Sequence, residues 1–177
     1  MSHFLYLRHF VCLTCFSVLV GLTAHLPLAD NVPLSFALYG GLHAVALSLA
    51  LRARQPLWRR VLFVGVAAAI SVLTLRSGLI ALQLLGNLTG NSRLYAALGF
   101  ASMMGALAYG ILIRQLIVYP LPASALVVIS VGCVAAAYVG FFALAHGHAL
   151  GRWWLAVLWW YAFSAGLWYF DRRPSTG

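Results

Sequence analysis

Residues 60–85 read RVLFVGVAAAISVLTLRSGLIALQLL, an apolar stretch that carries one internal charge, Arg76. About 20 consecutive, mostly apolar residues are enough for a helix to cross the hydrocarbon core of a membrane. Lipid offers the backbone no hydrogen-bond partners, so such a segment must satisfy its own N–H and C=O groups. The stretch therefore predicts a membrane-spanning α-helix.

The composition of the whole chain agrees with that helix. The 177 residues are 64% hydrophobic and only 7% charged, with a mean hydropathy of +0.97. An ordinary soluble domain is about 25% charged. This composition excludes a soluble globular enzyme, a disordered chain and a disulfide-stapled secreted module. It predicts a polytopic membrane protein.

Five further apolar segments flank residues 60–85, and turns rich in proline, glycine and asparagine separate them. They cover roughly 4–26, 33–52, 93–118, 121–145 and 151–170. We therefore predict an all-α integral membrane protein, a bundle of about six transmembrane helices that forms one polytopic domain over 1–177. Short links leave no extramembrane domain, so function is expected within the bundle or in contacts with partner chains.

The basic residues indicate the orientation of these helices. The net charge is +9, and all 11 basic residues are arginines. Most lie in the link between the second and third spans, near the end of the fourth span or near the two termini: Arg8, Arg52, Arg54, Arg59, Arg60, Arg114, Arg172 and Arg173. The positive-inside rule then predicts that both termini are cytoplasmic. Arginines placed between apolar blocks form no basic face for nucleic acid. An alanine- and leucine-rich chain without lysine suggests the inner (plasma) membrane of a bacterium.

Arg76 is the most informative residue, because a charged side chain inside a membrane helix costs at least about 2.5–3.5 kcal/mol. The chain has two acidic residues, Asp30 and Asp171, and neither lies inside a predicted span. Two interpretations follow. Arg76 extends outward to Asp30, to carbonyl groups or to lipid phosphate. Alternatively, its planar guanidinium binds an anionic substrate such as a phosphate, a carboxylate or a lipid headgroup.

His43 is the second candidate substrate-binding residue. It lies near the middle of span 33–52, at a depth similar to that of Arg76. A neutral imidazole both donates and accepts hydrogen bonds, so His43 is expected either to contact a ligand or to join a polar cluster. Ser71, Thr74 and Gln83 are the other candidate members of that cluster.

Three histidines are weak candidates for a metal or haem site. His25, His146 and His148 fall at span ends on the predicted outer side, where imidazoles on neighbouring helices can ligate iron. They lack strict ligand spacing, and ordinary interfacial histidines are the favoured interpretation. No cofactor is therefore expected.

Small and aromatic residues suggest how the helices pack. Glycines such as Gly40, Gly99, Gly105 and Gly110 allow helix backbones to approach closely in a compact bundle or an oligomer. Five of the six tryptophans lie in span 151–170 and spread around the helix. This pattern favours a lipid-exposed anchoring helix over a surface that stacks on a flat cofactor.

The sequence contains no recognisable catalytic motif and does not settle whether the protein is an enzyme, with a non-enzymatic role favoured. Three functional hypotheses remain. The first is a small membrane protein that transports or handles an anionic small molecule or lipid through Arg76 and His43. The second is an accessory subunit of a larger membrane complex, or a homo-oligomer. The third is a haem- or quinone-linked redox protein that uses the outer histidines.

Overall fold

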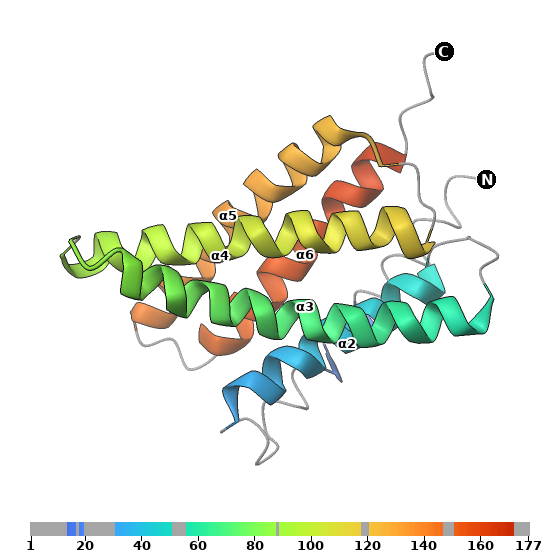
Figure 1. Ribbon diagram of the computed structural model, residues 1–177, viewed down its shortest axis with the longest axis horizontal. Coiled ribbons are helices and arrows are strands. Elements are labelled where there is room, and N and C mark those ends of the chain that lie inside the picture. Colours follow the sequence, from blue (N-terminus) through green and yellow to red (C-terminus); the bar gives the residue numbers. More distant parts are fainter. Residues whose placement is uncertain are drawn as a thin grey trace. The chain divides into compact units, whose positions relative to one another are not determined.

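The structure is a computed structural model that describes residues 14–16, 18–19, 31–50, 56–87, 89–117, 121–146 and 151–171, except for the side chains of residues 50, 151–156 and 171. Every element in these ranges is helical (Figure 1), which confirms the all-α prediction. The elements are α2 (Val32–Ala50), α3 (Leu57–Leu84), α4 (Gly90–Leu112), the π-helical turn η2 (Ile113–Ile117), α5 (Ala123–Ala145) and α6 (Gly151–Asp171). They match the second to sixth predicted spans to within a few residues. The first predicted span, 4–26, lies largely outside the described residues.

Four of these helices are long and apolar enough to cross a membrane: α2, α3, α4 continued by η2, and α5. Their outward side chains are also apolar, as the exposed Leu73, Val131 and Val139 show. A water-facing surface of this kind would aggregate, whereas lipid solvates it. The α6 helix is not among these four, which were identified from the described residues alone. A membrane protein is thus supported, while the six-helix count and the cytoplasmic termini stay predictions.

The chain divides into two compact units. Unit 1 comprises Met1–Val72 and Leu112–Tyr119, and unit 2 comprises Leu73–Ile111 and Pro120–Gly177. The division passes through α3 and through the end of α4. The expected single domain over 1–177 stays a prediction.

In unit 1, α2 packs closely against the first part of α3. A Cβ atom placed on Gly40 would lie 2.9 Å from the carbonyl oxygen of Ala67 and would overlap the hydroxyl of Ser71. A Cβ on the adjacent Gly41 would meet only ordinary contacts, the nearest at 3.8 Å. The two helices therefore pack closely at Gly40, in line with the expectation that glycines allow helix backbones to approach.

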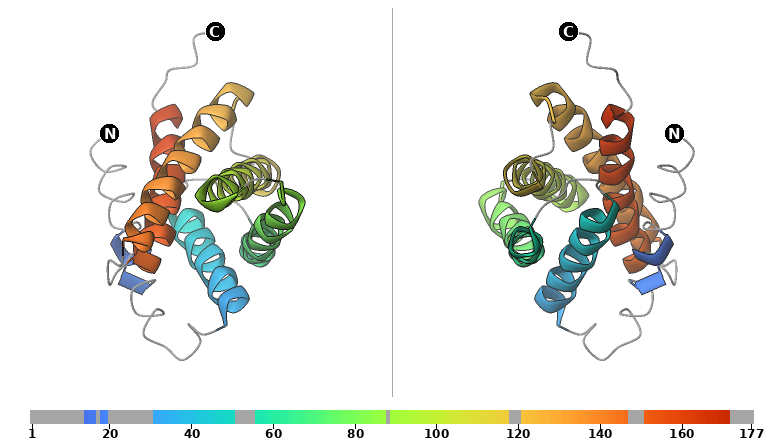
Figure 2. Two further views of the ribbon diagram at one scale, coloured as in Figure 1. Left: turned by 90° about the vertical axis from the view of Figure 1, so that its left-hand side faces the viewer. Right: turned by 90° about the vertical axis from the view of Figure 1, so that its right-hand side faces the viewer.

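In unit 2, α5 and α6 lie side by side along their lengths (Figures 1 and 2). Glycines again mark the contacts between helices. A Cβ on Gly105 of α4 would lie 2.8 Å from the side chain of Thr74 on α3, and a Cβ on Gly99 would overlap the hydroxyl of Tyr138 on α5. The predicted role of these α4 glycines in close packing is confirmed.

The core of unit 2 is aromatic. Tyr109 of α4 is fully buried and makes edge-to-face contacts with two α6 rings, Trp160 at 5.1 Å and Phe163 at 5.0 Å between centroids. The indole Nε1–H of Trp159 donates a 2.6 Å hydrogen bond to Ser102 Oγ. The expectation of a lipid-exposed anchoring helix is therefore wrong for Trp160, which is buried against Tyr109 of α4, whereas Trp159 is half-buried. Trp153 and Trp154 have no described side chains.

Candidate functional site

Arg76 lies on the outward face of α3. Its side chain is exposed, and the neighbouring residues on that face, Leu73 and Ile80, are 62% and 55% exposed. No hydrogen bond or ion pair joins Arg76 to any residue that the structure describes. The site is therefore a guanidinium that stands on an apolar helix surface, with no anion from the described part of the chain beside it.

The depth of Arg76 follows from the length of α3. The helix has 28 residues and is about 42 Å long, whereas the hydrocarbon core is about 30 Å thick. From Arg76 to Leu84 the helix rises about 12 Å. A centred α3 would place the backbone of Arg76 about 6 Å inside the hydrocarbon boundary, and an extended arginine side chain spans a similar distance. The guanidinium can therefore reach the layer of lipid phosphates.

His43 is placed quite differently. It lies in unit 1, is only 1% exposed, and packs edge-to-face against Phe16 with 5.2 Å between the ring centroids. Arg76 belongs to unit 2. The expectation that His43 and Arg76 bind one substrate together stays a prediction, and the imidazole already makes contacts in the core of its own unit.

The residues expected to form a polar cluster with His43 have other neighbours. The hydroxyl of Ser71 donates to the carbonyl oxygen of Ala67 at 2.9 Å, within its own helix. Thr74 packs against Gly105, and Gln83 is exposed near the end of α3. Hydroxyl groups in membrane helices commonly bond the preceding turn in this way. These contacts explain Ser71 and Thr74 without a ligand.

Of the three candidate metal ligands, only His146 is described. It ends α5, and its Nδ1 lies 2.8 Å from the carbonyl oxygen of Phe142. His25 and His148 lie outside the described residues. Among the described residues, no three histidine, cysteine, aspartate or glutamate side chains gather as a metal site would require. The metal hypothesis stays a prediction.

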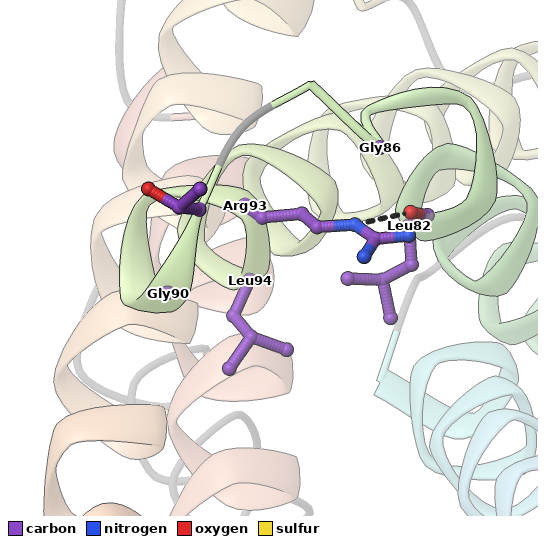
Figure 3. A pocket seen from close by; sticks show the side chains of 6 residues that line it. Leu82, Gly86, Gly90, Arg93 and Leu94 are labelled. Atoms are coloured by element: carbon purple, nitrogen blue, oxygen red, sulfur yellow. Dashed lines mark hydrogen bonds between the residues drawn. The ribbon is translucent and has the colours of Figure 1, made fainter.

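Sequence reasoning missed a hollow at the hairpin between α3 and α4. It is lined by residues from both helices and their link: Leu82, Gly86, Thr89, Gly90, Arg93 and Leu94 (Figure 3). Its volume is about 550 Å³. Arg93 reaches across from α4, and its Nε–H donates a 2.5 Å hydrogen bond to the carbonyl oxygen of Leu82. The available signal in the sequence was an arginine, Arg93, close to two loop glycines, Gly86 and Gly90.

No protein family, curated protein or solved structure matches this chain. Functional inference therefore depends on the chemistry of its side chains. Arg76 and Arg93 both belong to unit 2, and each presents guanidinium donors for an anion.

Proposed function

We propose that this protein is an integral membrane protein that binds and handles anionic lipids through Arg76. The supporting observation is the exposed guanidinium on the apolar, outward face of α3. Leaving that charge uncompensated in hydrocarbon costs at least about 2.5–3.5 kcal/mol, so an anion close to it is strongly favoured. With two acidic residues in the whole chain, a lipid phosphate is the most abundant anion at that depth.

A lipid suits this position better than a small ion that passes through the protein interior. The planar fork of arginine forms two parallel hydrogen bonds to a phosphate group. The exposed side chains of Leu73, Leu79 and Ile80 surround Arg76 and offer apolar contacts to acyl chains. The guanidinium can therefore contact the phosphate of a phospholipid while the apolar side chains around it contact the acyl chains. His43 has no role in this lipid binding.

An accessory subunit of a larger membrane complex is the second candidate function. The observation that favours it is an outward face of α5, where Val128 and Val131 are exposed and a Cβ on Gly132 would meet no atom within 4 Å. A partner helix can approach closely where side chains are small. A partner with an acidic residue inside its own helix would also pair with Arg76.

The test is native mass spectrometry of the protein released from membranes that contain anionic and zwitterionic lipids. Arg76→Gln should lower retention of the anionic lipid about tenfold, because a hydrogen-bonded charge pair contributes about 1.5–3 kcal/mol. Arg76→Lys should retain part of the binding, since lysine acts as a point charge. Arg114→Gln is the matched control: Arg114 is exposed on η2, and its loss lowers the net charge equally.

Equal lipid retention by the wild type and Arg76→Gln would contradict the proposal. A second polypeptide that remains bound to the wild type and is lost from Arg76→Gln would instead support the accessory subunit. Loss of anionic lipid from Arg114→Gln as well would show that net charge, and not the position of Arg76, controls retention.

A further inference from the structure

Arg93 keeps most of its hydrogen-bonding capacity unused. A guanidinium carries five N–H donors, and the Nε–H donor is the one that bonds Leu82. No described residue accepts a hydrogen bond from the two terminal nitrogens. The side chain is half-buried between α3 and α4, where it lines the hollow (Figure 3). The hollow therefore has a fixed positive group with donors available to a ligand.

The walls of the hollow suit an anion with an apolar attachment. Gly86 and Gly90 contribute no side chains, Thr89 adds a hydroxyl group, and Leu82 and Leu94 are apolar. None of the lining residues is acidic, so nothing there neutralises Arg93. The hollow has a volume of about 550 Å³ and is open to its surroundings, since four of its lining residues, Gly86, Thr89, Gly90 and Leu94, are exposed.

The position of the hollow narrows the class of ligand. It lies at the link between α3 and α4, both of which are long and apolar enough to cross a membrane. Such a link lies at the membrane surface, where lipid phosphates meet water. From Arg76 to Leu82, α3 rises about 9 Å, so the hollow is separate from the exposed face around Arg76.

We propose that this hollow is a second anion site that binds a phosphate ester, with the terminal nitrogens of Arg93 donating to the phosphate oxygens. The Nε bond to Leu82 holds the guanidinium in place, so its planar fork is already oriented for a bidentate contact. The phosphate comes either from a lipid headgroup or from a soluble phosphate at the membrane surface. The site does not depend on the proposed role of Arg76.

Two variants of the full-length protein test the hollow. Arg93→Gln removes the charge and the fork. Gly86→Leu fills the space, and the fold should accept it because a Cβ on Gly86 meets only the carbonyl oxygen of Gln83, at 3.5 Å. Arg114→Gln again controls for the change in net charge. Arg76→Gln tests whether binding in the hollow is independent of the site at Arg76. Thermal unfolding of each variant shows whether it is folded.

In the first arm, native mass spectrometry counts phosphatidylglycerol molecules retained from phosphatidylcholine nanodiscs that contain it as a minor component. A lipid source predicts that Arg93→Gln and Gly86→Leu each bind the lipid of the hollow about tenfold less and so retain fewer phosphatidylglycerol molecules than the wild type. Arg76→Gln should keep the lipid of the hollow. In the second arm, an arginine-specific glyoxal reagent modifies Arg93. The extent of this modification is measured at increasing concentrations of inorganic phosphate. If phosphate protects Arg93 in the wild type but not in Gly86→Leu, the ligand of the hollow is a soluble phosphate.

The proposal is overturned if Arg93→Gln and Gly86→Leu both retain phosphatidylglycerol as the wild type does and phosphate fails to protect Arg93. Loss of lipid from Arg76→Gln alone, with no protection of Arg93 by phosphate, would leave the site at Arg76 standing and remove the site at the hollow. Loss of lipid from Arg93→Gln and Gly86→Leu, with none from Arg76→Gln, would leave the site at the hollow standing and remove the site at Arg76.

Discussion

At the scale of single residues, the hydrogen bond from Trp159 to Ser102 ties α6 to α4 in the core of unit 2. The two residues are 57 positions apart in the chain. An indole N–H in an apolar core loses free energy when its acceptor is removed, because no water replaces it. Hydrogen bonds between membrane helices contribute about 0.6 kcal/mol on average and about 1.7 kcal/mol at most.

Ser102→Ala is expected to lower the free energy of unfolding by about 1 kcal/mol, because it leaves the Trp159 indole without its acceptor. Unfolding in mixed detergent micelles, followed by circular dichroism, measures the change. Trp159→Phe with and without Ser102→Ala completes a double-mutant cycle. Additive losses in that cycle would show that the hydrogen bond makes no contribution.

At the scale of helices, α2 and α3 pack tightly at Gly40. Gly40 lies against the backbone of Ala67 and the hydroxyl of Ser71, whereas Gly41 has ordinary contacts. The Ser71 hydroxyl is itself bonded to the Ala67 carbonyl oxygen, so it cannot turn away without losing that bond. An added methyl group at position 40 must therefore separate the two helices.

Gly40→Ala is expected to destabilise the protein by about 1–3 kcal/mol through overpacking. Gly41→Ala is the matched control on the same helix and should be neutral or slightly stabilising, since alanine favours a helix by about 1 kcal/mol over glycine. The same detergent unfolding assay compares them. If the two variants are equally stable, the close approach at Gly40 does not exist in the membrane.

At the scale of the whole molecule, the described helices account for four candidate membrane spans. The arginine distribution and an even number of spans predict that both termini are cytoplasmic. The link between α3 and α4, which carries the hollow, is then predicted on the outer side. Orientation therefore decides which leaflet supplies lipids to Arg76 and Arg93.

Reporter fusions should show this orientation. A green fluorescent protein joined after Gly177 is expected to fluoresce, because it folds in the cytoplasm, and alkaline phosphatase at the same position should be inactive. Alkaline phosphatase joined after Asn87 should be active, because that link is predicted outside. Active alkaline phosphatase at the C-terminus would refute the predicted cytoplasmic C-terminus.

Much of the fold was predictable because hydropathy is a local property. A run of about 20 apolar residues forms a helix in lipid whatever its neighbours are. The predicted segments from 33–52 to 151–170 therefore correspond to α2 to α6. Arg76 was identified for the same reason, since one charge within such a run needs no alignment to be noticed. The Arg93 hollow was missed because it requires α3 and α4 to meet.

The sequence by itself determined the all-α class, the membrane character, the helix boundaries to within a few residues, and some of the glycines at helix contacts, such as Gly40 and Gly105. Only the tertiary structure decided that Arg76 is exposed, that His43 is buried, and that Trp160 faces the core while Tyr161 does not. The physical reason is that these helices are apolar on all sides, so hydrophobicity does not show which face points inward. Shape complementarity between helices selects that face, and shape is a property of pairs of helices.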